Sequence, residues 1–459
     1  MPQLKSSLFY IALLQGLRGF IWYGIQVMVS IYLLKYFHLP LREVYIIYGC
    51  LMIMGYATPL VGGILIDYLC GSEAILVLSF LLMMLGFGAM AVDTELGFRF
   101  GVSLILLGVG FLKSSAGTVL ACFYETHSDS QRDKAFGGMY FSVNIGAILA
   151  PIALGVFVDK NAWNVIFAIS GLLSMIGFIF ALHLLKEEVY SRKVLTGFLI
   201  SLLLASFSAV FLIWPIAFSF VLMILAFVIC IYVLRSIVKN YRSYLSAVLF
   251  LFMLNFVTML YLAGDLQVGA SLSILAFTHL HYSIGTVSIP PMFYNALLPL
   301  FVVLGLWVYL PLVSLLKRYP FSVSVLYRMG FAMLCCAFAF LAFAKVAAIM
   351  EVRQSADLIV WVVVGYFFLG CGELIISSTV LSATAVLAPV NLRGTFMGIF
   401  YLFDVLSGYF SGLIAMMTTV SLPYFHNGVA GTYLIISVFS FLILFPLWIL
   451  KKYLNGVSS

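Results

Sequence analysis

The sequence holds very little charge. Only 8% of its 459 residues are Asp, Glu, Lys or Arg, whereas 64% are hydrophobic and the mean hydropathy is +1.19. A soluble domain carries roughly 25% charged residues, so this composition excludes a water-facing globular protein. The net charge of +7 is spread thinly and forms no basic cluster, which excludes a nucleic-acid-binding surface.

The sequence also lacks the patterns of common catalytic sites. It has no phosphate-binding Gly-Lys-Ser/Thr loop, and no predicted loop exceeds about fifteen residues, which leaves no room for a soluble catalytic domain. The seven Cys and six His show no zinc-ligand spacing, so buried free thiols are expected. We therefore expect no enzyme, no metal and no cofactor, and the N-terminus shows no cleavage site of a signal peptide.

Long apolar runs are what the sequence does contain. A bilayer core of about 30 Å needs roughly 20 apolar residues per helix. Runs of that size predict fourteen spans, near 7–36, 43–68, 73–91, 98–122, 134–158, 162–185, 193–214, 216–238, 243–276, 290–316, 322–348, 356–388, 391–420 and 429–450. The pattern predicts an all-α polytopic membrane protein with an N-terminal six-helix bundle (1–190), a two-helix insert and linker (191–242) and a C-terminal six-helix bundle (243–459).

Lys and Arg are distributed unevenly between the predicted loops. With the N-terminus inside, fifteen of them fall on the cytoplasmic side and six on the opposite side. Cytoplasmic loops of membrane proteins carry an excess of these residues. We therefore expect both termini in the cytoplasm, and the compact loops favour a bacterial inner (plasma) membrane.

Five ionisable residues fall toward the middle of predicted spans and away from their ends: Arg18, Lys113, Asp265, Glu373 and Asp404. A charge at the bilayer centre costs about 2.5–3.5 kcal/mol on insertion scales, so each is a candidate functional residue. Lys113 and Glu373 form either a static ion pair or, as we favour, a clamp for the carboxylate and ammonium groups of a zwitterion. For Asp404 we favour a hydrogen bond between helices over a proton site.

The first span carries a polar stripe. Four residues lie within about 80° of one another on a 3.6-residue helix: Gln15, Arg18, Trp22 and Gln26. Such a stripe faces either a water-filled cavity or a polar neighbouring helix. We expect Trp22 and Gln26 to contact a solute, and Gln15 and Arg18 to take part in proton coupling.

Asp265 and Gln267 pose a geometric problem in the seventh major span. On a regular helix they would point about 200° apart, so both could not face inward. Gly264 and Gly269 flank them and permit a local break. We expect such a break, with Asp265 as a further proton-coupling candidate.

Five stretches of the sequence occur in the order of one family's motifs. They are Tyr56-Ala-Thr-Pro-Leu-Val-Gly-Gly-Ile-Leu-Ile-Asp67, Gly110-Phe-Leu-Lys113, Met139-Tyr-Phe-Ser-Val-Asn-Ile-Gly-Ala-Ile-Leu-Ala-Pro151, Gly372-Glu-Leu-Ile-Ile-Ser377 and Leu387-Ala-Pro-Val-Asn-Leu-Arg-Gly-Thr-Phe-Met-Gly398. Together they resemble the proton-coupled oligopeptide transporters (the POT or PTR2 family) of the major facilitator superfamily, over nearly the whole chain.

The resemblance implies roles for several residues. Lys113 matches a lysine that meets the peptide carboxylate, and Glu373 matches a glutamate that holds the peptide amine and takes part in proton coupling. Asn144 matches an asparagine that contacts the peptide backbone, Tyr23 a cavity tyrosine, and Gln267 a glutamine of the seventh span. We expect all three to contact the solute. The implied partners are a small peptide-like solute, protons and the lipid bilayer, with no nucleic acid.

Two departures from the family pattern keep an alternative open. The first-span motif Glu-x-x-Glu-Arg-Phe aligns to Gln15-Gly-Leu-Arg18-Gly19-Phe20, and the seventh-span carboxylate column holds Leu266 beside Asp265. We favour a secondary active transporter that carries di- and tripeptides or peptide-like zwitterions with protons by alternating access. The alternatives are an importer or exporter of a specialised peptide-like metabolite, such as a siderophore, with altered or absent proton coupling, or a non-transporting receptor on the same fold.

Overall fold

The computed structural model describes residues 2–123, 129–183, 192–240, 244–280, 282–284, 287–316, 318–350, 357–388, 393–420 and 428–454. Within these ranges, fourteen helices or joined helices are long and apolar enough to cross a membrane, which confirms the predicted number. Backbone polar groups have no water to bind in lipid, so each span must satisfy them internally as a helix does.

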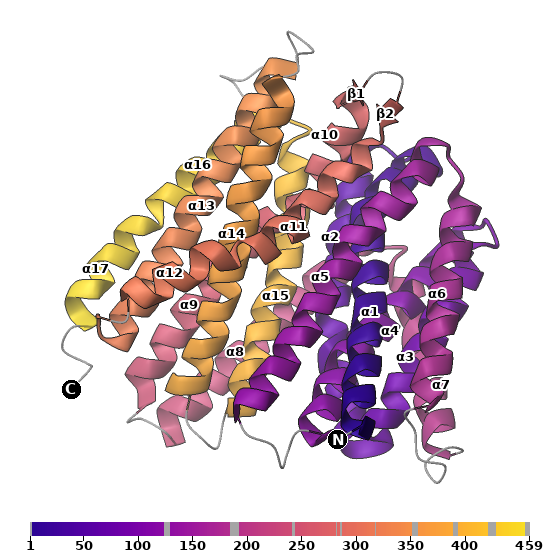
Figure 1. Cartoon of the computed structure of the whole chain (residues 1–459), viewed down its shortest axis with the longest axis horizontal. Helices are drawn as coiled ribbons and strands as arrows, with labels where there is room; N and C mark the ends of the chain where they lie inside the picture. The colour runs from indigo at the N-terminus through magenta and orange to yellow at the C-terminus, as the bar shows by residue number, and fades with distance from the viewer. Residues whose placement is uncertain are drawn as a thin grey trace. The chain divides into compact units, whose positions relative to one another are not determined.

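The elements follow one another along the chain with short connections (Figure 1). In chain order they are α1 (Pro2–Lys35), α2 (Leu41–Leu65), the π-helix η1 (Ile66–Cys70), α3 (Ser72–Met90), α4 (Glu95–Phe123), α5 (Asp129–Asp159), α6 (Trp163–His183), α7 (Arg192–Phe211), α8 (Pro215–Asn240), α9 (Leu245–Asp265), the 3-10 helix η4 (Leu266–Val268), α10 (Ser271–His279), β1 (Tyr282–Ile284), β2 (Val287–Ile289), the 3-10 helix η5 (Pro291–Ala296), α11 (Leu297–Leu304), α12 (Leu306–Leu316), α13 (Phe321–Met350), α14 (Asp357–Leu387), α15 (Arg393–Met417), α16 (Gly428–Leu442) and α17 (Leu444–Leu454).

Two short strands depart from the helical pattern. β1 and β2 pair antiparallel, with Tyr282 opposite Ile289 and Ile284 opposite Val287. They follow α10 and lie outside the spans, in a segment where the sequence analysis predicts only a loop. Because the hairpin is so short, the fold remains an all-helical membrane bundle.

The first of two compact units comprises Met1–His38 and Cys50–Ser219. Within it, α1 packs along α5, and α3 packs against both α4 and α6. The insert helix α7 also belongs here, because it packs against η1, α3 and α4. Leu78, Phe111 and Ala205 are fully buried where these helices meet.

The second unit comprises Leu39–Gly49 and Phe220–Ser459. In it α14 contacts α9, α11 and α13, while α15 packs on α9 and α16 on α13 (Figure 1). The start of α2 is included, because the Tyr48 hydroxyl donates a hydrogen bond to the Leu266 carbonyl at 2.9 Å. Most of the insert helix α8 falls in this unit and α7 in the other, and the three-part division of the chain stays a prediction.

The break predicted in the seventh major span is confirmed. The α-helix ends at Asp265, a 3-10 turn covers Leu266–Val268, and α10 begins at Ser271. The tighter turn changes the angular offset between neighbouring side chains. Both polar residues of the segment are buried, with Asp265 only 7% exposed and Gln267 completely buried.

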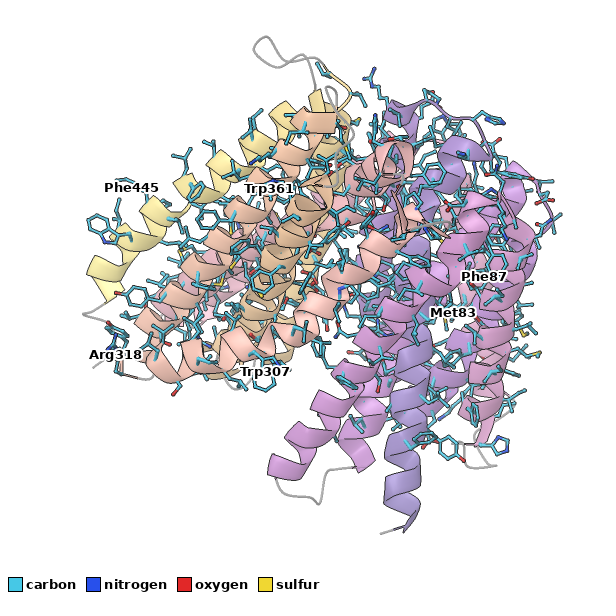
Figure 2. The ribbon with its side chains drawn as sticks, turned by 45° about the horizontal axis from the view of Figure 1, so that its top comes forward. Met83, Phe87, Trp307, Arg318, Trp361 and Phe445 are labelled. Carbon is cyan, nitrogen blue, oxygen red and sulfur yellow. The ribbon has the colours of Figure 1, made fainter. Side chains whose placement is uncertain are left out.

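The cysteines and the outer surface also match a membrane bundle. The six cysteines whose side chains are described are free and buried, as predicted, and the Cys122 side chain lies outside the described set. Large apolar side chains are exposed on many helices; Trp307, for example, is 81% exposed. Figure 2 shows Trp307 and Phe445 at the surface of the second unit, where lipid tails solvate such side chains.

Candidate functional site

In the first unit, the intramembrane cation Lys113 lies against aromatic rings. Its Nζ is 5.8 Å from the centroid of the Tyr56 ring, and Tyr56 meets Trp22 edge-on with ring centroids 5.9 Å apart. α4, α2 and α1 therefore bring these three residues together. A cation within about 6 Å of an aromatic ring is attracted by the electron-rich face, so the cluster partly compensates the charge that the membrane disfavours.

The local structure of α2 explains how this cluster is positioned. Pro59 has no N–H, so the Gly55 carbonyl one turn earlier loses its usual donor. The Thr58 hydroxyl lies 3.2 Å from the Gly55 carbonyl and 3.0 Å from the Leu106 carbonyl of α4. This hydroxyl ties α2 to α4. At Gly55 itself, a Cβ would come within 2.4 Å of the Trp22 ring, so the glycine makes room for that ring.

The polar stripe of α1 contains an internal hydrogen bond. Arg18 Nε donates to Gln15 Oε1 at 2.6 Å, which brings together two of the predicted proton-coupling residues. Gln15 is buried and Arg18 partly buried. Tyr23 is partly buried, and Gln26 is buried with an Oε1 that accepts no hydrogen bond from the residues described. Three of the four residues of the stripe are thus buried within the protein, and Arg18 is partly buried.

Asn144 lies on α5 where that helix touches α1. Its Nδ2 donates to the Tyr140 carbonyl at 3.0 Å, and the side chain is buried. A Cβ on Gly19 would lie 2.2 Å from the Val143 carbonyl oxygen, so only glycine fits at this crossing. Small residues of this kind let membrane helices approach closely, which places Asn144 beside the Arg18 segment of α1.

In the second unit, two acidic residues from different helices lie close together. α9 packs on α14, and this places the carboxyl groups of Asp265 and Glu373 within electrostatic range of each other. Tyr261 and Cys336 also lie within electrostatic range of Asp265. A Cβ on Gly372 would lie 2.5 Å from the Tyr261 hydroxyl, so this glycine lets α9 and α14 approach one residue before Glu373.

The acidic pair has no cationic partner in the described part of the chain. Neither carboxyl group forms an ion pair there, and Asp265 Oδ1 accepts no hydrogen bond from the described residues. Two neighbouring carboxylates repel each other when both are ionised, and a charge within the membrane is costly by itself. The arrangement therefore disfavours simultaneous negative charge on both carboxyl groups.

Gln267 joins a hydrogen-bond network at the helix break. Its Nε2 lies 3.0 Å from the Ser411 carbonyl on α15 and 3.2 Å from the Ser411 hydroxyl. Its Oε1 accepts a 2.8 Å hydrogen bond from Ser271, whose own hydroxyl accepts one from Tyr433 at 2.8 Å. The side chain predicted to contact a solute is therefore engaged in contacts among α15, α16 and the broken span.

A second network supports the other side of the break. The Ser273 hydroxyl donates to the Val268 carbonyl at 2.5 Å, and Asn295 Nδ2 donates to Ser273 at 3.0 Å. The Tyr366 hydroxyl of α14 then donates to Asn295 Oδ1 at 3.0 Å. Broken helices persist in membranes only where protein groups satisfy the freed backbone. Sequence reasoning did not identify Asn295 or Tyr366, because their partners are distant in the chain.

Asp404 is buried on α15, with 3% of its surface exposed. The Ser407 hydroxyl donates to the Asp404 carbonyl at 2.6 Å. Its carboxyl group remains a candidate for a contact between helices.

The fold matches that of known transporters. A solved structure described as giving insight into substrate recognition in proton dependent oligopeptide transporters has a TM-score of 0.80 at 20% identity, covering 99% of both chains. A POT family transporter in complex with 5-aminolevulinic acid has the same TM-score at 19% identity, covering 98% of this chain and 96% of that one. The chain therefore has the major facilitator fold.

The sequence comparisons identify the family. The profile of the POT family (PTR2) matches residues 73–426. Dipeptide and tripeptide permease A of Serratia proteamaculans is 26% identical over 418 residues, which cover 87% of this chain and 80% of the permease. Dipeptide and tripeptide permease A of Escherichia coli is 25% identical, over 89% and 84%. The chain belongs to the POT family, whose members are transporters and not enzymes.

Proposed function

We propose that this multi-pass membrane protein is a proton-coupled symporter of di- and tripeptides or peptide-like zwitterions that works by alternating access. The observation that carries the proposal is the pair of carboxyl groups, Asp265 and Glu373, which lie within electrostatic range in membrane-embedded helices and have no cationic partner among the described residues. Such a pair can hold and release a proton, which is the minimum that proton coupling requires.

The substrate contacts are assigned by charge. We assign Lys113 to the substrate carboxylate and Glu373 to its ammonium group, because these are the bonds that charge-assisted recognition favours. Tyr23 and Asn144, with Trp22 and Gln26, are assigned to the uncharged parts of the solute. Gln267 is assigned a positioning role, since both ends of its amide are occupied by hydrogen bonds.

Coupling between proton and substrate follows because the substrate ammonium group and the proton can both bind the Glu373 carboxylate. When an ammonium group binds the Glu373 carboxylate, that carboxylate is stabilised in its ionised form, and a proton on the pair is more favourably held by Asp265. Loss of the substrate leaves the ionised Glu373 without its counter-charge, so the single proton is again shared between the two carboxyl groups. Proton and substrate thus bias the same equilibrium, which is the condition for linkage between them. Arg18 and Gln15 are assigned a supporting role in coupling within the first unit.

The comparisons favour peptides over a siderophore-like metabolite. The relatives are named dipeptide and tripeptide permeases, and the structural neighbours include a POT family transporter in complex with a thioalcohol conjugated peptide. Both 5-aminolevulinic acid and a peptide carry an amine and a carboxylate, the groups that Glu373 and Lys113 complement. We place the protein in the inner (plasma) membrane with both termini in the cytoplasm, as the distribution of Lys and Arg indicates.

The direct test is uptake of labelled di- and tripeptides into proteoliposomes, with and without an inside-alkaline pH gradient. We expect the gradient to drive uptake, and Lys113→Ala and Glu373→Gln to reduce it about tenfold to hundredfold, since bonds to charged groups contribute roughly 1.5–3 kcal/mol.

Two charged residues outside the candidate site provide matched controls for these variants. Lys345→Ala removes an exposed lysine that lies 3.7 Å from the Trp361 ring centroid, and Glu95→Gln removes an exposed glutamate paired with Arg99. Both should leave uptake unchanged. Equal loss in variants and controls, or native uptake that ignores the gradient, would count against the proposal.

A further inference from the structure

An apolar cavity of about 770 Å³ lies within the second unit, between α8, α9 and α15. Its wall includes Phe227 and Ile231 of α8, Phe252 of α9, and Phe403 and Leu406 of α15. The remaining lining side chains are also Met, Ile, Phe or Cys. The volume is within the range of roughly 300–1,000 Å³ that is typical of small-molecule sites.

The chemistry of this wall excludes a peptide as the occupant. No lining side chain carries a strong hydrogen-bond donor or acceptor, and an unbonded peptide group in such surroundings is strongly disfavoured. The wall is also elongated. From Ile224 to Ile231 the lining follows α8 for about 10 Å at 1.5 Å per residue, and several of its side chains are exposed. A long hydrocarbon chain fits both the chemistry and the shape.

The part of the chain that includes α8 and nearly all of α9 carries charge of one sign. Residues 189–264 contain no Asp or Glu but five Lys or Arg. Two of these, Arg235 and Lys239, are exposed on α8 beyond the cavity. Arg235 lies four residues after Ile231 and eleven after Ile224, so it continues the same helix stripe that lines the wall. A ligand whose chain fills the cavity would therefore present its polar end to Arg235.

We infer that the cavity binds a single anionic phospholipid, with an acyl chain between α8, α9 and α15 and the phosphate group beside Arg235 and Lys239. Basic residues attract anionic headgroups over short distances, and arginine binds phosphate through several N–H donors. The inference is independent of the proposed transport function. It gives α8 a role, since a bound lipid links this helix to the core helices of its unit.

The test is native mass spectrometry of the whole chain incubated with phosphatidylglycerol or phosphatidylcholine. We expect the native protein to retain phosphatidylglycerol preferentially, by about fivefold for each of the two basic residues. Leu406→Trp fills the cavity and should abolish retention of either lipid. Arg235→Gln with Lys239→Gln leaves the cavity intact and should abolish only the preference for the anionic lipid.

The controls place the same changes outside the cavity. Leu203→Trp adds a ring at a side chain on α7 that is 72% exposed, and Lys193→Gln removes an exposed lysine at the start of α7. Both should behave as the native chain. Equal retention of the two lipids by the native protein would overturn the inference, as would full retention by Leu406→Trp. A mass of two chains that Leu406→Trp abolishes would instead assign the cavity to a second copy.

Discussion

The two units hold intramembrane charge in opposite ways. In the first, Lys113 lies against the Tyr56 ring, so this permanent cation is accommodated by an aromatic group. In the second, Asp265 and Glu373 lie close together without a cation among the residues described. The first arrangement favours a constant charge, whereas the second favours a charge that changes with the binding of a proton or an amine.

Both arrangements depend on a glycine that faces an aromatic side chain. Gly55 leaves room for the Trp22 ring, and Gly372 leaves room for the Tyr261 hydroxyl. In each case the glycine lies next to a residue of the charged cluster. A glycine that makes room for an aromatic side chain therefore occurs beside a cation in one unit and beside an acidic pair in the other. The two units differ in the charge of these groups, although the local helix packing is alike.

The largest effect is expected when one acidic group of the second unit is removed at a time, which tests whether this unit carries the charge that changes during transport. We expect Asp265→Asn to abolish stimulation of uptake by the pH gradient, a loss of about tenfold or more, while peptide counterflow continues. Glu373→Gln should reduce both, because it also removes the partner of the substrate amine. Uptake and counterflow in proteoliposomes measure the two effects separately.

Asp404→Asn provides the control for that experiment. Asp404 is also a buried carboxylic acid in the second unit, but it lies on α15, and it should retain gradient-stimulated uptake. If Asp404→Asn abolished the stimulation and Asp265→Asn did not, the acidic pair would not be the coupling site.

A smaller effect is expected at the helix break of the second unit. Gln267→Leu keeps a similar volume but removes the bonds to Ser411 and Ser271. Hydrogen bonds between membrane helices contribute about 0.6 kcal/mol on average and at most roughly 1.7, so the melting temperature in detergent should fall by a few degrees. Ser206→Ala, which removes an exposed bond within one helix, should leave it unchanged. An unaltered melting temperature for Gln267→Leu would show that the network does not stabilise the break.

The smallest effect is expected at the aromatic partner of Lys113. Tyr56→Leu removes the ring and should weaken peptide binding about two- to fivefold, as expected for a partly exposed cation–ring contact of roughly 0.5–1 kcal/mol. Tyr56→Phe keeps the ring and should bind like the native protein. Peptide affinity from concentration-dependent uptake distinguishes the two. Equal weakening in both variants would assign the role to the hydroxyl group and not to the ring.

Much of the fold follows from local features of the sequence. Span number depends on the length of apolar runs, which the bilayer thickness fixes, so the fourteen spans were predictable. The break after Asp265 was predictable too, because Asp265 and Gln267 cannot both face inward on a regular helix. Lys113 and Glu373 stand out because charge is rare within spans. Each of these inferences needs only neighbouring residues.

Contacts between distant parts of the chain were not predictable in this way. The proximity of Asp265 to Glu373 depends on how α9 packs on α14, and Gln267 finds Ser411 across 144 positions of sequence. Tyr56 belongs to a motif of the sequence, but the contact between its ring and Lys113 depends on how α2 packs on α4. The spacing of residues along one helix does not determine which face of another helix they contact. These partners could therefore be identified only from the structure.

The glycine contact between α1 and α5 has a consequence for motion. At Gly19 and Gly146 the two backbones touch, since a Cβ on Gly146 would lie 2.0 Å from the Gly16 carbonyl oxygen. No side chain lies between the two backbones at this contact, so no change of rotamer could allow one helix to slide along the other. α1 and α5 are therefore expected to travel as one stiff element during the transport cycle, so that Arg18 and Asn144 keep a fixed spacing while the elements around them move.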